Sequence, residues 1–243
     1  ESVWVRVTRN GQEGYGEGCP RIYVTGETVE GSLSWIQDTF GGEAAFASLE
    51  DLRQWVEDHE EEIDVHPSAW CAVELAVLDL LSRERDWTVE RLLGLDDSRR
   101  WGRYTAVLGD DETWQYTSLV DQYLVRGLTD FKIKVSGNLG RDLEKLQVLE
   151  TLAAYHRVRP LRMRLDANNV WWGRCDEAVA HVRALGPERV LAVEEPVAPK
   201  AVGEIDRFIQ ATGVAVILDE SLCTRRDLAA FAPLSGPLIA NIK

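Results

Sequence analysis

Six ionisable side chains recur at nearly regular intervals in the second half of this 243-residue sequence. Two lysines lie two positions apart in a short segment, so a β-strand would point both side chains to the same face. From the second lysine onward the separations are 32, 28, 25 and 24 residues, which is about one strand-and-helix unit each time. The six residues are Lys132, Lys134, Asp166, Glu194, Asp219 and Lys243.

The types of these residues suit one kind of chemistry. Carboxylates without histidine or cysteine are the ligands of a hard divalent cation, so we expect Asp166, Glu194 and Asp219 to bind Mg²⁺, or Mn²⁺ in its place. A lysine is a poor base at its ordinary pKa of about 10.4, but an adjacent metal or second lysine lowers that pKa. The metal also stabilises an oxyanion on the substrate. These parts together suit removal of a proton alpha to a carboxylate, giving a metal-held enediolate.

From about Trp101 onward, short predicted strands alternate with amphipathic helical segments. Repeated units of this length indicate a parallel sheet, either doubly wound or closed as a barrel. The carboxyl ends of consecutive strands then meet at one mouth, where barrel enzymes place their chemistry. The predicted strands are Tyr104–Leu108, Asp130–Val135, Leu161–Asp166, Val190–Glu194, Val214–Asp219 and Leu238–Lys243. The predicted helices include Leu143–His156, Asp176–Leu185, Val202–Thr212 and Arg226–Phe231.

Residues 1–100 follow a different, α+β pattern. Ser2–Arg9 alternates as a strand does, Asn10-Gly11 is a hairpin turn, and a second strand runs towards Gly18. The glycines at 14, 16 and 18 are not followed directly by a helix, so we interpret them as a bend or close backbone approach rather than a phosphate loop. Helices are predicted at Val29–Thr39, Leu49–Glu60 and Ser68–Arg85.

The predicted fold class is therefore α/β, a (β/α) barrel of the TIM type that is preceded by an α+β domain. Residues 101–243 provide about six strands, whereas a complete eight-stranded barrel takes about 250 residues. We expect two more barrel units, and the beginning of the first domain, to lie outside this sequence.

Composition excludes some partners. With 27 basic and 41 acidic residues the formal charge is −14, which disfavours binding to nucleic acid or to an anionic membrane surface. No apolar run approaches the roughly 20 residues of a membrane span. Cys19, Cys71, Cys175 and Cys223 show no zinc spacing and are expected to be buried free thiols of a cytoplasmic protein. The four histidines are interpreted as structural residues.

Five short motifs, in this order, resemble those of the enolase superfamily and, more closely, of its muconate-lactonizing subgroup. They are Phe131-Lys132-Ile133-Lys134, Leu165-Asp166-Ala167-Asn168, Val193-Glu194-Glu195-Pro196, Leu218-Asp219-Glu220-Ser221 and Asn241-Ile242-Lys243. A lysine base acting with Mg²⁺ is an established feature of that superfamily. A lysine at the last position favours this subgroup over the mandelate racemase branch, which uses a His–Asp pair.

The resemblance implies a role for each motif residue. Asp166, Glu194 and Asp219 would bind Mg²⁺. Lys134 would be the acid/base on one face of the substrate and Lys243 its counterpart on the other. Lys132 would lower the pKa of Lys134 or contact the substrate carboxylate. Three further residues would orient the metal ligands: Asn168, Glu195 and Glu220.

The resemblance also implies a capping domain over residues 1–100, in which the loop Pro20–Thr28 closes over a small carboxylate substrate. Tyr23, Val24 and Thr25 are its candidate contact residues. The loop is most similar to that of dipeptide epimerases, whereas Glu194-Glu195-Pro196 favours an o-succinylbenzoate synthase. Epimerisation, muconate-type cycloisomerisation and dehydration all remain open. We expect the full-length protein to be a homo-oligomer.

Two alternatives compete with an enzyme. A non-catalytic relative that serves as a binding or structural subunit would lack Mg²⁺-dependent exchange of a substrate alpha proton. A doubly wound binding protein with unrelated carboxylates would have an open sheet with helices on both faces.

We predict that these 243 residues, expressed alone, are inactive and prone to aggregation, because six parallel strands leave two edge strands open. The full-length protein is expected to be a soluble enzyme. The check compares the soluble yield and Mg²⁺-dependent proton exchange of the two. A stable, monomeric and active 243-residue protein would show that the strand count is wrong.

Overall fold

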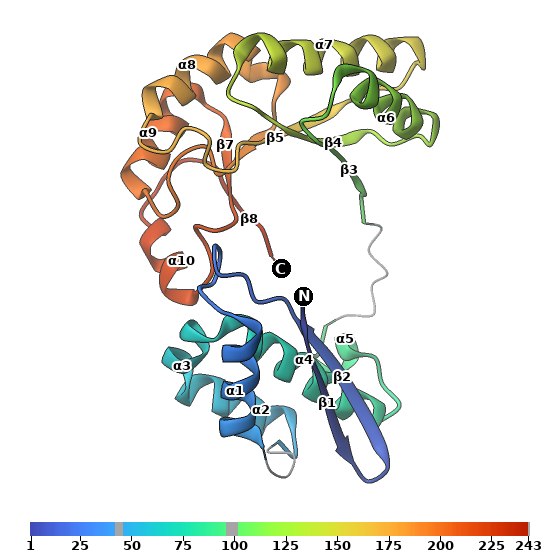
Figure 1. Ribbon diagram of the computed structural model, residues 1–243, viewed down its shortest axis with the longest axis vertical. Coiled ribbons are helices and arrows are strands. Elements are labelled where there is room, and N and C mark those ends of the chain that lie inside the picture. Colours follow the sequence, from blue (N-terminus) through green and yellow to red (C-terminus); the bar gives the residue numbers. More distant parts are fainter. Residues whose placement is uncertain (42–45, 96–101, 243) are drawn as a thin grey trace. The chain divides into compact units, whose positions relative to one another are not determined.

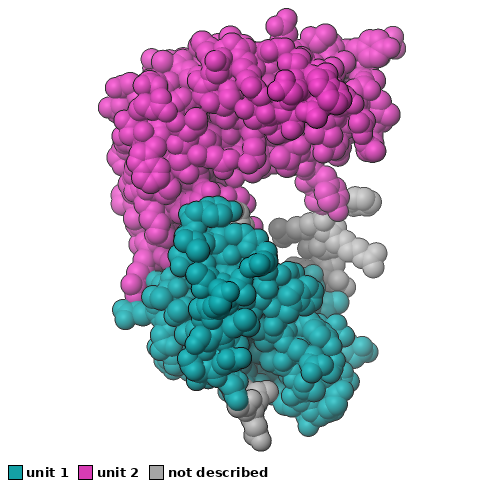
Figure 2. All heavy atoms as spheres, in the orientation of Figure 1, with its two compact units in different colours: residues 1–100 teal, residues 101–243 magenta. Residues whose placement is uncertain are grey.

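The computed structural model describes residues 1–41, 46–95 and 102–242. The chain divides into two compact units, residues 1–100 and residues 101–243 (Figure 1, Figure 2). Within the described ranges, no helix has the length and apolar character needed to cross a lipid bilayer.

The first unit contains a hairpin and helices. The strands β1 (Val3–Arg9) and β2 (Gln12–Gly18) pair antiparallel, and the turn residues Asn10 and Gly11 both have positive φ. The helices are α1 (Val29–Phe40), α2 (Leu49–Asp58), α3 (Glu60–Val65), α4 (Pro67–Arg83) and α5 (Val89–Leu92).

The alternate glycines of β2 pack directly on the backbone of α4. A Cβ added at Gly14, Gly16 or Gly18 would lie 2.2, 2.1 or 2.0 Å from a carbonyl oxygen of α4. Those oxygens belong to residues four apart, Ala76, Ala72 and Ser68. Two strand residues span about 6.8 Å and four helix residues about 6.0 Å, so the two spacings match along the contact. The predicted close approach is confirmed.

An aromatic cluster forms the core of the first unit. Trp55 and Trp70 stack with ring centroids 4.5 Å apart, and Trp35, Phe40 and Phe46 lie around them. The cluster packs on the apolar face of α4 through Val73, Val77 and Leu81.

The second unit is a six-stranded parallel sheet in the order β3-β4-β5-β6-β7-β8. Figure 1 shows these strands following a curve with the helices along its outer side. The strands are β3 (Thr105–Leu108), β4 (Asp130–Lys134), β5 (Arg162–Asp166), β6 (Ala192–Glu194), β7 (Ala215–Leu218) and β8 (Leu238–Ala240). The helices are α6 (Thr113–Val125), α7 (Leu139–Tyr155), α8 (Cys175–Leu185), α9 (Val202–Thr212), α10 (Arg225–Phe231) and the short 3₁₀ helix η1 (Pro187–Arg189).

The two faces of this sheet differ in character. One face is apolar and packs against the helices, and Phe131, Ile133 and Leu165 are buried there. The strand residues that alternate with these are charged, and they include Lys132 and Asp166. Side chains of a strand alternate between faces, so the charged residues share the inner, concave face of the curve. The predicted α/β fold with an incomplete (β/α) barrel is confirmed.

Several element boundaries differ from the sequence prediction. Strand β7 ends at Leu218, so Asp219 follows the strand instead of ending it. Helix α6 was missing from the predicted helices, and α7 begins at Leu139 rather than at residue 143. The earlier start follows from the N-cap Asn138, whose side chain accepts a hydrogen bond from the backbone N–H of Arg141 at 3.1 Å.

The cysteine prediction was only half right. All four thiols are free, but Cys19 and Cys223 are exposed and only Cys175 is fully buried. The two exposed residues lie in connecting segments outside the helices and strands, and such segments run over the surface.

A carboxylate from far along the chain caps helix α4. The N-cap residue His66 makes no side-chain capping bond. Instead the buried side chain of Glu27 accepts hydrogen bonds from the backbone N–H groups of Ser68, at 2.8 Å, and Ala69, at 3.0 Å. A negative charge at a helix N-terminus is favourable, and these bonds fix the end of the loop that contains Tyr23–Thr25.

We predict that Glu27→Ala lowers the free energy of unfolding by about 1–3 kcal/mol, because two buried N–H groups lose their acceptor. Calorimetry of the intact protein should show a lower Tm. The exposed Glu57 of α2 offers a control, and Glu57→Ala should change stability by less than about 0.5 kcal/mol. Equal effects of the two variants would contradict the capping role.

Candidate functional site

The centre of the site is an ion cluster on the charged face of the second unit. Asp166 and Glu194 are register partners on the neighbouring strands β5 and β6. The Nζ atom of Lys132 lies 3.0 Å from Asp166 Oδ2, and 3.1 and 3.2 Å from the two carboxylate oxygens of Glu194. Both carboxylates are buried, with 3% and 5% of their surface exposed. The lysine ammonium therefore bridges two buried anions.

The cluster is short of positive charge. Burial by itself lowers the pKa of Lys132, but the hydrogen bonds and charges of Asp166 and Glu194 outweigh it, so this pKa lies above its ordinary value. Burial raises the pKa of Glu194, and the charge of Asp166 raises it further, despite the nearby Lys132. One ammonium thus does not balance the buried carboxylates.

The third predicted ligand, Asp219, lies one residue beyond β7 and is half-buried. Its negative charge also raises the pKa of Glu194, which places it in electrostatic reach of that side chain. Among the residues that the structure describes, no three histidine, cysteine or acidic side chains are already arranged to hold a metal ion.

The donor set nevertheless fits a hard divalent cation. Its donor atoms are carboxylate oxygens. Two of the carboxylates, those of Asp166 and Glu194, already pair with the ammonium group of Lys132. Mg²⁺ is usually bound through a few carboxylates together with water and substrate oxygens. That Asp166, Glu194 and Asp219 act as its ligands stays a prediction.

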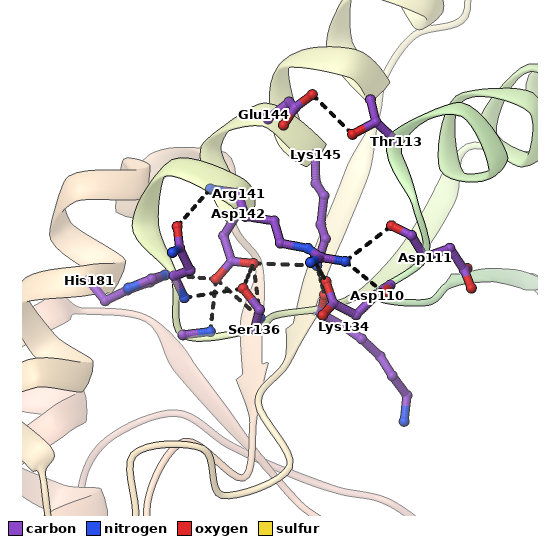
Figure 3. A network of polar contacts seen from close by, with 12 residues as sticks. Asp110, Asp111, Thr113, Lys134, Ser136, Arg141, Asp142, Glu144, Lys145 and His181 are labelled. Atoms are coloured by element: carbon purple, nitrogen blue, oxygen red, sulfur yellow. Dashed lines mark hydrogen bonds and ion pairs between the residues drawn. The ribbon is translucent and has the colours of Figure 1, made fainter.

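The predicted acid/base lysine is next to this cluster. Lys134 is the last residue of β4 and the register partner of Asp166, on the same face as Lys132. Figure 3 shows its side chain extending away from the polar network that surrounds its backbone. Lys243 lies outside the described residues, so its place across the site stays a prediction.

Glu195 holds the turn that carries Asp219. Its side chain is 1% exposed, and its Oε1 atom accepts hydrogen bonds from the backbone N–H groups of Asp219, at 2.6 Å, and Ser221, at 2.8 Å. The hydroxyl of Ser221 lies 2.7 Å from Oε2. The role in orienting the metal ligands, which the family resemblance implies for Glu195, stays a prediction.

The other two predicted orienting residues are placed differently. Asn168 is exposed and contacts Asp166 through its backbone N–H, at 3.2 Å, and Glu220 is half-buried. The neighbouring Asn169, which sequence reasoning missed, has a buried Oδ1 atom without a hydrogen-bond partner in the described part of the chain. The sequence has two consecutive asparagines at this point, and nothing in it indicates which of the two side chains is buried.

The predicted substrate loop forms a tight turn in the first unit. The backbone N–H groups of Val24 and Thr25 donate to the carbonyl oxygen of Arg21 at 3.0 and 2.8 Å. Tyr23 is 83% exposed, and Val24 and Thr25 are half-buried. Their contact with a substrate stays a prediction.

Comparison with known proteins assigns the family. Residues 115–243 match the family model described as enolase C-terminal domain-like. The chain therefore belongs to the enolase superfamily, in its mandelate racemase and muconate-lactonizing subgroup.

Named relatives in this subgroup are epimerases and racemases. The hydrophobic dipeptide epimerase of Enterococcus faecalis is 26% identical over 236 residues, which is 97% of this chain and 64% of the relative. The L-Ala-D/L-Glu epimerase of Bacillus subtilis is 28% identical over 256 residues, covering 100% of this chain and 65% of the relative. The chain thus spans somewhat less than two thirds of these relatives.

A solved structure supports the fold. The dipeptide epimerase of Enterococcus faecalis, crystallised with Mg and the dipeptide L-Leu-L-Tyr, matches with a TM-score of 0.84 at 24% identity. The match covers 100% of this chain and 66% of that one.

We predict that Glu195→Ala destabilises the intact protein by about 2–4 kcal/mol, because the N–H groups of Asp219 and Ser221 lose their acceptor. Glu195→Gln retains one acceptor oxygen and should cost less than about 1.5 kcal/mol. Thermal denaturation of the two variants checks the prediction. Equal losses for the two would show that these hydrogen bonds do not hold the turn.

Proposed function

We propose that the intact protein containing this chain is a Mg²⁺-dependent epimerase or racemase that acts on a small carboxylate, a dipeptide or an N-acyl amino acid. The observation that carries the proposal is the position of Asp166 and Glu194, buried side by side at the carboxyl ends of adjacent strands, with Lys134 on the same face. Charged residues are expensive to bury, so their presence here favours a functional site.

Asp166, Glu194 and Asp219 would hold the metal ion. When bound, it would supply positive charge that stabilises the enediolate form of the substrate carboxylate. Lys132 would then exchange part of its contact with the two carboxylates for contact with substrate, since its ammonium now occupies the place between them.

The lysines would move the proton. In its neutral form, Lys134 would accept the alpha proton of the substrate on Nζ, and Lys243 would return a proton to the opposite face of the same carbon. Reversing these roles would interconvert the two stereoisomers. This step leaves the substrate's composition unchanged, as an epimerase requires.

Epimerisation is favoured over the synthase reaction. The named relatives are dipeptide and amino-acid epimerases, among them those of Enterococcus faecalis and Bacillus subtilis. The sequence argument for a synthase depended on Glu195, but this side chain bonds the turn at Asp219–Ser221. The named relatives therefore carry the preference for epimerisation.

We predict that the intact protein exchanges the alpha proton of dipeptides or N-succinyl amino acids with D₂O when Mg²⁺ is present and stops when EDTA removes the metal. Lys134→Ala should slow the exchange of one stereoisomer by at least about 100-fold, because it loses its general base. Nuclear magnetic resonance of both stereoisomers measures this exchange.

The matched control is Lys200→Ala, which removes a half-exposed lysine that pairs with Asp227. It should retain the exchange of both stereoisomers. Absence of exchange from the wild-type protein across this substrate panel would favour the non-catalytic alternative, and full activity of Lys134→Ala would refute the acid/base role.

A further inference from the structure

A second ion cluster, which the sequence did not reveal, lies directly behind Lys134 (Figure 3). Its central cation is Lys145 of α7, whose side chain is 5% exposed. The Nζ atom donates to the backbone carbonyl oxygen of Lys134 at 2.8 Å. It also pairs with Asp142 Oδ1 at 3.4 Å and with Asp110 Oδ1. Three acceptors thus match the three N–H bonds of the ammonium.

The carbonyl of Lys134 needs a partner because the sheet ends beside it. The register of β3 and β4 stops at Leu108 and Ile133, so Lys134 has no partner residue on β3. On the other side, β4 continues to be held by β5, where the N–H of Val135 donates to the carbonyl of Asp166 at 3.0 Å. Lys145 replaces the missing strand contact.

Asp142 holds the segment that follows Lys134. Its carboxylate, 1% exposed, accepts hydrogen bonds from the backbone N–H groups of Ser136 and Gly137, at 2.9 and 3.1 Å, and contacts His181 Nε2 at 3.0 Å. Burial alone raises the pKa of Asp142, but the bonds from His181 and Ser136 and the charge of Lys145 outweigh it. Its pKa therefore lies below the ordinary value, and the group stays an anion.

We propose that Lys145, locked by Asp142 and Asp110, is a positioning residue that sets the end of β4 and thereby aims the side chain of Lys134 at the substrate. The proposal rests on the acid/base role proposed for Lys134. Lys145 reaches only the backbone of Lys134, so it acts through that residue and does not itself touch the substrate.

The cluster joins the loop after β3, the end of β4, and helices α7 and α8 through Asp110, Lys134, Asp142 and His181. A base must sit within a few tenths of an ångström of its productive position, and a misplacement of about 1 Å can cost about 100-fold in rate. Loss of Lys145 would release one side of the backbone that carries the base.

The test compares Lys145→Met and Lys145→Arg in the intact protein with Arg189→Met. Arg189 also anchors α7, through a bidentate pair with Glu150 at 2.8 and 2.7 Å, but it is the last residue of η1 and does not contact Lys134 in the described part of the chain. The three variants therefore separate damage to the anchoring of α7 from damage to the position of Lys134.

The decisive readout is the stereochemistry of alpha-proton exchange in D₂O. Lys145→Met should slow exchange of the stereoisomer deprotonated by Lys134 by about 100-fold through kcat, with KM little changed, and leave the other stereoisomer near wild type. Lys145→Arg should recover part of the loss. Equal slowing of both stereoisomers, or the same result in Arg189→Met, would overturn the proposal.

A second readout does not need activity. Acetylation of Lys134 by acetic anhydride, followed by mass spectrometry, should become several-fold faster in Lys145→Met and stay unchanged in Arg189→Met. If the wild-type protein shows no exchange, the proposed function fails, and this labelling alone decides whether Lys145 positions Lys134. Unchanged labelling would overturn the positioning role.

Circular dichroism establishes that each variant is folded. If Lys145→Met is not folded, Asp110→Asn serves instead, because Asp110 is 38% exposed and tolerates substitution better. It removes one of the two anions that lock Lys145 and should give the same stereochemical asymmetry with a smaller loss. A symmetric effect would again overturn the proposal.

Discussion

Two carboxylates buried on adjacent parallel strands are the interaction around which the second unit is arranged. Neighbouring strands lie about 4.8 Å apart, so residues in register, such as Asp166 and Glu194, have no room to separate their charges. Burying such a pair is costly without a cation. Lys132 provides one positive charge for the two carboxylates, and burial together with the charge of Asp166 still holds the pKa of Glu194 above its ordinary value.

This constraint explains why the two faces of the sheet differ. The apolar face, with Phe131, Ile133 and Leu165, packs with the helices and supplies the hydrophobic stabilisation. The other face is then free to carry charges. Backbone atoms next to those charges are held by buried polar side chains, Glu195 behind Asp219 and Lys145 behind Lys134. The charged face is thus supported by groups that lie one layer behind it.

Much of this arrangement follows from sequence periodicity. Because strand side chains alternate, Lys132 and Lys134 had to share a face, and consecutive strand ends brought Asp166 and Glu194 together. The family motifs then assigned candidate roles. The boundaries were less predictable: β7 ends with its apolar run at Leu218, so Asp219 lies one residue beyond the strand that was predicted to include it.

The supporting contacts were beyond prediction for a physical reason. Lys145 and His181 lie on helical faces whose apolar spacing indicates only burial. Lys145 pairs locally with Asp142, three residues away, but its other partners are Asp110, 35 residues away, and the backbone carbonyl of Lys134. The Asp142 partner of His181 is 39 residues away. The choice between Asn168 and Asn169 depends on the conformation of a turn, where both residues have positive φ. Pattern reasoning carries no information on such local geometry.

The central claim is that the Asp166–Glu194 pair binds a divalent cation, and Mn²⁺ titration of the intact protein followed by electron paramagnetic resonance tests it most directly. We predict one Mn²⁺ bound per chain, displaced by Mg²⁺, and a large loss of affinity in Asp166→Asn and Glu194→Gln. Failure of the wild-type protein to bind Mn²⁺, or undiminished binding by both variants, would contradict the account.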